Sequence, residues 1–224
     1  MKQFVAVAYP LSDNLPSAYD NRALAKSAKS RKIPTMNVKV AALSGLASLV
    51  ALNAPAQTAK AVVGHYAALV EATYADALNK ATTMEKAIED FLAEPSSSAL
   101  DAARAAWTAA RIPYLQSEVF RFYEGPIDDE DGPEGLLNAW PLDESYVDYV
   151  KGDLKAGIIN NPGDFPKIDA ELIESLNEKG GEANISCGYH AIEFLLWGQD
   201  FSAAGPGQRP FTDYTSADHA DRRA

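Results

Sequence analysis

The chain has 224 residues, of which 47% are hydrophobic, enough to build a sizeable core in one or two domains. Its formal charge is −11, and residues 57–224 hold thirteen Lys/Arg against twenty-nine Asp/Glu, so the body repels phosphate backbones and is a poor candidate for binding nucleic acid. Cys187 is the only cysteine, which excludes an intrachain disulfide and leaves packing or a metal to hold the fold.

The first 56 residues divide into two segments that we expect the mature protein to lack. Residues 1–35 show no periodic apolar pattern, and we interpret them as a non-native extension ahead of a true start at Met36. Residues 36–56 have a basic lead, thirteen mostly apolar residues and a final Ala-Pro-Ala, which is typical of a signal peptide cleaved after Ala56. This apolar run is shorter than the roughly 20 residues that span a bilayer, so we expect no stable membrane span. The alternative is an ordinary buried helix.

Two long helices are predicted next. Residues 59–93 place apolar side chains at helical spacing and predict one long amphipathic helix. Glu94-Pro95 ends it, and a following serine can cap the second helix. Residues 100–122 are Ala-rich and helical, with a break or kink expected at Pro113, because proline lacks a backbone donor.

The remaining elements are shorter. Residues 125–145 predict an ordered loop with Leu136 and Trp140 buried, and residues 157–166 predict a second loop. Helices are expected near 146–150, at 168–178 and around His190, followed by a structured segment at 209–214 and a helix start at 215–224. No stretch alternates as a β-strand does, so the predicted fold class is all-α, a helical bundle.

The most informative motif is Gly188-Tyr189-His190-Ala191-Ile192-Glu193. On a helix, residues three apart project from nearly one side, so His190 and Glu193 could hold one metal ion. The alternative is a core histidine that hydrogen-bonds Glu193. A zinc-peptidase helix would need a second histidine at position 194, which is Phe194.

Other candidate ligands have simpler structural interpretations that compete with metal binding. Glu118 lies three residues before Arg121, which favours an intrahelical ion pair. Asp128 follows Gly-Pro-Ile and could stabilise a turn through its side chain. Cys187 could ligate a metal, although burial as a small apolar residue is the commoner role.

The sequence resembles the imelysin-like family, which is similar to the EfeO-type iron-uptake proteins and to iron-regulated proteins of the bacterial envelope. The resemblance covers most of residues 57–215. It rests on three segments: Trp107 through Asp128, containing Ala110-Arg111, Tyr114, Glu118, Phe120-Arg121-Phe122 and Gly125-Pro126-Ile127-Asp128; Gly188 through Asp200, containing the GxHxxE motif; and Gly205 through Tyr214, containing Arg209-Pro210 and Asp213.

The resemblance implies an exported, all-helical protein built of two four-helix-bundle-like halves, of which residues 57–224 form about the first, so that the domain is truncated. It also implies a metal site on His190 and Glu193, with Glu118 and Asp128 as further ligands. Arg121, Arg209 and Asp213 are then expected to orient ligands or to contact the second half. No catalytic residue is assigned.

These observations predict a periplasmic or otherwise exported protein that binds a metal ion for iron uptake or homeostasis, with envelope iron-transport proteins as partners. Three carboxylates and one imidazole suit a divalent or ferric ion, iron before zinc. One alternative is a metal-dependent peptidase in which Glu193 activates water. Another is a metal-free interaction module of the envelope, in which the His190–Glu193 pair is structural.

Overall fold

The computed structural model describes residues 57–121, 123 and 125–224. The interpretations of residues 1–35 and 36–56 concern segments outside these ranges. Within the described part the chain forms helices and no strand, apart from an isolated bridge between Val150 and Asp153. The prediction of an all-α helical bundle is confirmed. Among the described helices, none is long and apolar enough to cross a membrane.

Two long helices carry the rest of the fold. Helix α2 spans Ala59–Ala93, the bounds that its apolar spacing predicted, and α3 spans Ser97–Ser117. Ser96 caps α3, because its hydroxyl accepts a hydrogen bond from the Ala99 amide at 3.2 Å. Helix α3 runs through Pro113 without a break, and the 3-10 helix η2, Glu118–Phe120, follows it.

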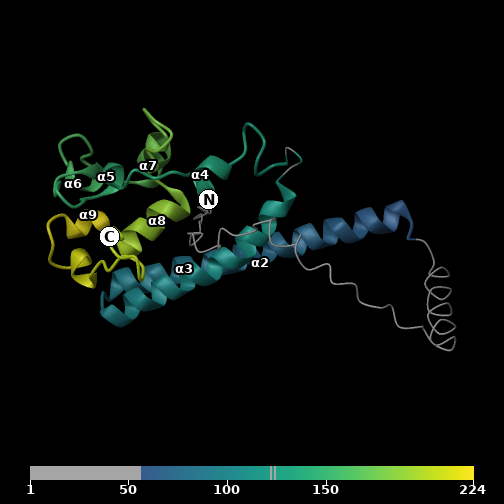
Figure 1. The fold of residues 1–224 in the computed structure, drawn as a ribbon, viewed down its shortest axis with the longest axis horizontal. Helices are drawn as coiled ribbons and strands as arrows, with labels where there is room; N and C mark the ends of the chain where they lie inside the picture. Colours follow the sequence, from purple (N-terminus) through teal and green to yellow (C-terminus); the bar gives the residue numbers. More distant parts are fainter. Residues whose placement is uncertain (1–56, 122, 124) are drawn as a thin grey trace, which may run out of the picture. The chain divides into compact units, whose positions relative to one another are not determined.

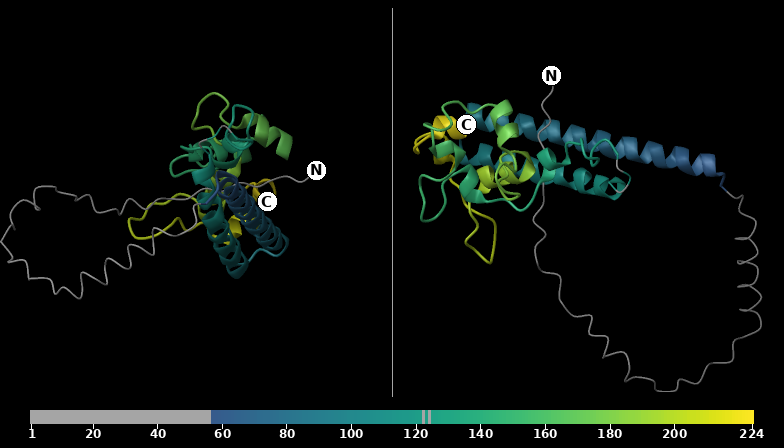
Figure 2. Two further views of the ribbon diagram at one scale, coloured as in Figure 1. Left: turned by 90° about the vertical axis from the view of Figure 1, so that its right-hand side faces the viewer. Right: turned by 90° about the horizontal axis from the view of Figure 1, so that it is seen from above.

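Residues 68–224 belong to one compact unit, and residues 57–67, the first turns of α2, are assigned to another. In the larger unit, α3 runs back alongside α2, as Figures 1 and 2 show. Their facing side chains form the core together with aromatic residues of α8, Gly188–Trp197, and with Tyr214. The Trp107 indole stacks edge-on against Tyr189 and Trp197 and donates to the Tyr189 carbonyl at 3.2 Å. The rings thus fix α8 against α3.

Short elements connect these helices. They are α4 (Glu134–Asn138), α5 (Glu144–Val147), α6 (Gly157–Asn160), α7 (Ala170–Leu176), the 3-10 helix η3 (Phe211–Tyr214) and α9 (Ala220–Arg223). The two predicted loops therefore each contain a helix that the sequence did not indicate, α4 and α6. The expected burial is also wrong for two side chains, because Leu136 is 39% exposed and Trp140 is 67% exposed.

Both ends of α8 are fixed by the elements packed against them. At its start Gly188 has φ of +83°, and a Cβ there would lie 2.6 Å from the Leu136 carbonyl oxygen, so α4 can approach only because the residue is glycine. At its end the Arg104 guanidinium donates to the Leu196 carbonyl at 2.9 and 3.1 Å and to the Arg209 carbonyl at 2.8 Å. These contacts give α8 a defined position on α3.

Candidate metal centre

His190 and Glu193 lie one turn apart on α8. His190 Nδ1 is 3.3 Å from Glu193 Oε2, and the side chains are 8% and 24% exposed. The imidazole Nδ1 is buried and makes no hydrogen bond. The hydrogen bond to Glu193 that a satisfied core histidine would make is therefore absent, although the two atoms lie within ion-pair distance of each other. An unpaired buried nitrogen facing a carboxylate is unfavourable unless a proton or a cation completes the pair.

The separation of these two atoms suits a shared ion. Nitrogen and oxygen ligands lie about 2.0–2.2 Å from a transition metal, so two neighbouring ligands on one ion are about 3.0–3.4 Å apart. The observed 3.3 Å falls in this range. The pair therefore fits as half of a metal centre, with the imidazole as a borderline ligand and the carboxylate as a hard one.

The indole of Trp140 covers the imidazole. The two ring centroids are 4.3 Å apart, with the planes inclined by 45°. Trp140 lies in residues 139–143, the segment that joins α4 to α5 and has no helical structure of its own. The sequence predicted neither this contact nor the exposure of the indole.

Glu118 and Arg121 form the ion pair that their spacing predicted, with Arg121 Nη2 at 2.6 Å from Glu118 Oε1. Arg121 also pairs with Glu134 and lies over the ring of Tyr114 at 5.7 Å. Burial lowers the pKa of Arg121, but Tyr114 and the two glutamates outweigh it, so the net pKa is raised. Glu118 is consequently held by a guanidinium, and a metal ion would have to compete with Arg121 for it.

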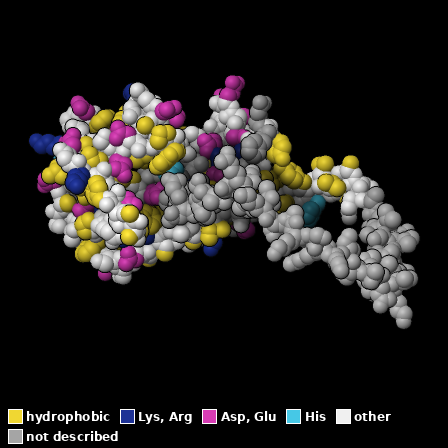
Figure 3. All heavy atoms as spheres, in the orientation of Figure 1, with side chains coloured by type: hydrophobic (Ala, Val, Ile, Leu, Met, Phe, Trp, Pro, Cys, Tyr) yellow, Lys and Arg dark blue, Asp and Glu magenta, His cyan; other side chains and the backbone are white. Residues whose placement is uncertain are grey.

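Asp128 stabilises a turn, because its Oδ1 accepts a hydrogen bond from the Gly125 amide at 3.1 Å. Asp128 and Glu118 nevertheless line the same pocket, whose volume is about 700 Å³. The other charged residues that line it are Arg121, Asp129, Glu130, Glu134 and Glu178. Figure 3 shows acidic side chains spread over the visible face of the described part, with few Lys or Arg among them. This pocket can attract cations, because carboxylates predominate on its walls.

The structure thus brings the four predicted ligands together in two pairs. Glu118 and Asp128 share the acidic pocket, whereas His190 and Glu193 are not among its lining residues. In the ranges that the structure describes, no three His, Cys, Asp or Glu side chains are close enough to hold one ion. A centre with all four ligands therefore stays a prediction.

Arg111 lies within electrostatic reach of both pairs. Its guanidinium is buried, lies 5.2 Å from the centroid of the Tyr189 ring and donates to Asn138 Oδ1 at 3.2 Å. Burial lowers the pKa of Arg111 to about 10, and the charges of Glu118 and Glu193 act in the opposite direction. The interior beside the candidate ligands therefore already holds one positive charge.

Arg209 and Asp213, which were expected to orient ligands, belong to a different cluster. The buried Asp148 carboxylate accepts hydrogen bonds from Arg209 at 2.6 Å and from Arg223 at 2.7 and 2.9 Å. Asp213 accepts from Arg209 at 3.2 Å and from the Tyr149 hydroxyl at 2.6 Å. The negative charges of two carboxylates here balance the positive charges of two guanidiniums, which explains how four charged groups can be buried together.

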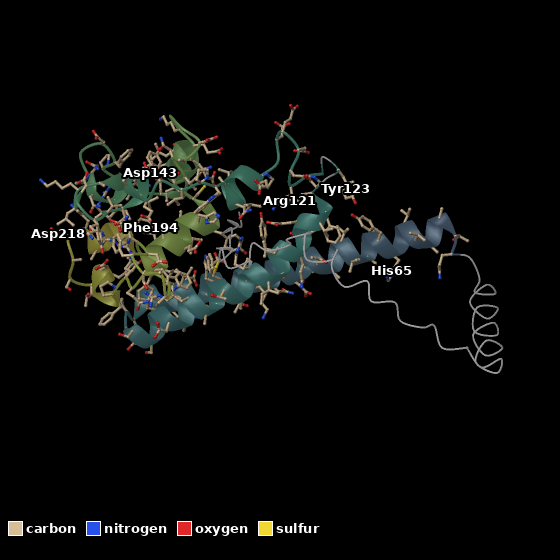
Figure 4. The ribbon with its side chains drawn as sticks, in the orientation of Figure 1. His65, Arg121, Tyr123, Asp143, Phe194 and Asp218 are labelled. Carbon is tan, nitrogen blue, oxygen red and sulfur yellow. The ribbon has the colours of Figure 1, made fainter. Side chains whose placement is uncertain are left out.

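This cluster is built from residues other than the four predicted ligands. In Figure 4, Arg121 lies on the segment after α3, whereas Phe194 lies on α8, where its ring packs 5.3 Å from the Arg209 guanidinium. No local pattern indicated a role for Asp148, because its partners come from distant segments. A signal did exist for Arg111, which shares a helical face with Tyr114 and Glu118.

Comparison with known proteins identifies the same family as the sequence motifs do. The sequence profile of the imelysin family, which carries a peptidase label, matches residues 70–224. A curated relative, the iron-regulated protein A of Synechococcus elongatus, is 35% identical over 86 residues. That alignment covers 38% of this chain and 23% of the relative, so the match spans about a quarter of the relative's length.

Proposed function

Because this chain belongs to the imelysin family, we propose that it is an exported protein of the bacterial envelope that binds a metal ion, iron in the first place, for iron uptake or homeostasis. The name of the relative, an iron-regulated protein, supports the link to iron. Export is supported by the signal-like residues 36–56. Sequencing of the native amino terminus tests it: Gln57 is expected, and an intact Met1 would refute export.

The observation that carries the metal proposal is the His190–Glu193 pair. A buried Nδ1 without a hydrogen bond lies 3.3 Å from a carboxylate oxygen, which is the spacing of neighbouring ligands on one ion. His190 would supply nitrogen, and Glu193 would supply oxygen. Both sit on a helix whose two ends are fixed, so the ligand atoms need little reorganisation to bind.

The acidic pocket has a supporting role in this proposal. Glu118 and Asp128 would raise the local cation concentration and supply oxygen ligands if Arg121 releases Glu118. Envelope iron-transport proteins are the expected partners in this role. A bound ion would also satisfy the orphaned imidazole nitrogen.

Calorimetry with ferrous iron under anaerobic conditions, and with zinc, tests the proposal. The wild type should bind iron, while His190→Gln and Glu193→Gln should bind it at least about tenfold more weakly. His65→Gln is the matched control, because this histidine is exposed on α2, and it should bind like the wild type. Absence of a binding signal in a wild type with full helicity would refute the metal proposal and favour the metal-free envelope module.

A metal-dependent peptidase is the second candidate, favoured by the label that the family profile carries. Glu193 would then activate a water molecule beside the ion. The residue at position 194 weighs against it, because Phe194 is buried under Arg209 where a zinc-peptidase helix would need histidine. Cleavage of a denatured protein substrate that is lost in Glu193→Ala would select this alternative.

A further inference from the structure

Trp140 combines two properties that ordinary packing does not explain. It is 67% exposed, although large aromatic residues gain most when they are buried. Its indole nevertheless lies against the His190 imidazole, with the ring centroids 4.3 Å apart and the planes inclined by 45°, and the His190 side chain is only 8% exposed. Part of the indole therefore contacts the imidazole while most of the side chain faces solvent.

The segment that carries Trp140 is held at both ends. Ala139 is buried, and the Asp143 amide donates to the Ala183 carbonyl at 2.7 Å. Asp143 also caps α5 by accepting from the Ser145 amide at 2.9 Å. The backbone is thus anchored on either side of the tryptophan, whereas the indole itself is mostly exposed.

We propose that the indole of Trp140 is a movable cover that controls access of solutes to the His190–Glu193 pair. The identity of the solute as a metal ion rests on the proposed function. Glu193 is three times as exposed as His190, at 24% against 8%. An incoming cation would therefore meet the carboxylate first, and the imidazole would become available when the indole moves aside.

The test uses the full-length, metal-free protein and reads the reactivity of each histidine. The chain has three histidines, so carbethoxylation by diethyl pyrocarbonate can be followed for each one by peptide mass spectrometry. The reaction is run at one buffered pH for all variants, so that the rates of the three histidines can be compared. His65, exposed on α2, is the internal standard.

Three variants distinguish a specific effect of Trp140 on the His190 imidazole from a general loosening of the structure. Trp140→Ala should raise the modification rate of His190, relative to His65, several-fold, while Trp140→Phe keeps a ring and should remain close to the wild type. Phe201→Ala is the matched control, because Phe201 is 69% exposed and packs against Lys151; it should leave the His190 rate unchanged. An unchanged rate in Trp140→Ala, or an equal increase in Phe201→Ala, would overturn the proposal.

A second measurement distinguishes failure of the proposed metal binding from failure of the proposed role of Trp140. Stopped-flow mixing with ferrous iron should show faster association in Trp140→Ala than in the wild type. A wild type that binds no metal would refute the proposed function, whereas the modification rates would still decide whether Trp140 covers the imidazole. If the wild type and Trp140→Ala have equal association rates and equal His190 modification rates, the proposal that Trp140 covers the imidazole is refuted, whereas the proposed metal binding is not.

Discussion

Replacing Asp148 with asparagine should destabilise the fold strongly, because the carboxylate is fully buried and balances two guanidiniums. Its side chain is 0% exposed and lies 2.6 Å from Arg209 and 2.7 Å from Arg223. The substitution keeps the shape of the side chain and removes its charge. Breaking a buried ion pair costs about 3–5 kcal/mol, out of a total stability of about 5–15 kcal/mol.

We expect the lower end of this range, because Arg209 retains Asp213 as a partner at 3.2 Å. A loss of about 3 kcal/mol, with a urea dependence of about 2 kcal/mol per molar, lowers the unfolding midpoint by about 1.5 M. Urea titration followed by helical circular dichroism measures this shift directly. The matched control is Asp90→Asn, which breaks the exposed ion pair with Lys86 and should cost at most about 1 kcal/mol. A midpoint shift for Asp148→Asn no larger than that of the control would refute the reasoning.

Three further predictions concern pH, the start of α8 and the acidic pocket. Burial raises the pKa of Asp148, but its bonds to Arg223 and Arg209 outweigh burial and hold the pKa below its usual range. The resulting stability is present above the unfolded-state pKa of about 4 and is lost as pH falls below it, so thermal melts should show this acid loss in the wild type and not in Asp148→Asn. Gly188→Ala should cost about 1–3 kcal/mol in urea titration, because φ is +83° and the new Cβ would collide with the Leu136 carbonyl; an unchanged midpoint would contradict the described approach of α4. Arg121→Gln should raise the affinity for ferrous iron in calorimetry, because the guanidinium no longer competes for Glu118, and an unchanged affinity would remove Glu118 from the ligand set.

The sequence predicted the elements whose signal is long and local. Helix α2 was predicted with its observed bounds, because its apolar positions repeat over many turns. The break that was one of the two outcomes predicted at Pro113 is not formed, because the buried residues of α3 pack well enough to outweigh the lost backbone hydrogen bond. Helices α4 and α6 were missed, since five and four residues are too few to show a helical period.

For the candidate site too, local relations could be predicted from the sequence and contacts between distant residues could not. The spacing of His190 and Glu193 placed both on one side of a helix, as the structure has them. The contact between Trp140 and His190 joins residues that are far apart in the sequence, so no local pattern encodes it. The Asp148 cluster joins residues that lie 61 and 75 positions apart, so no single-sequence periodicity could indicate it.

The contacts of Arg104 limit how a metal centre on α8 could adapt. Its guanidinium bridges the Leu196 and Arg209 carbonyls, and therefore ties the last turn of α8 to the middle of α3. A sliding or screw motion of α8 would break the two hydrogen bonds that Arg104 donates to the Leu196 carbonyl. Ions of unequal radius must then be accommodated by side-chain torsions alone, so the pair should discriminate among cations by size instead of reshaping around each of them.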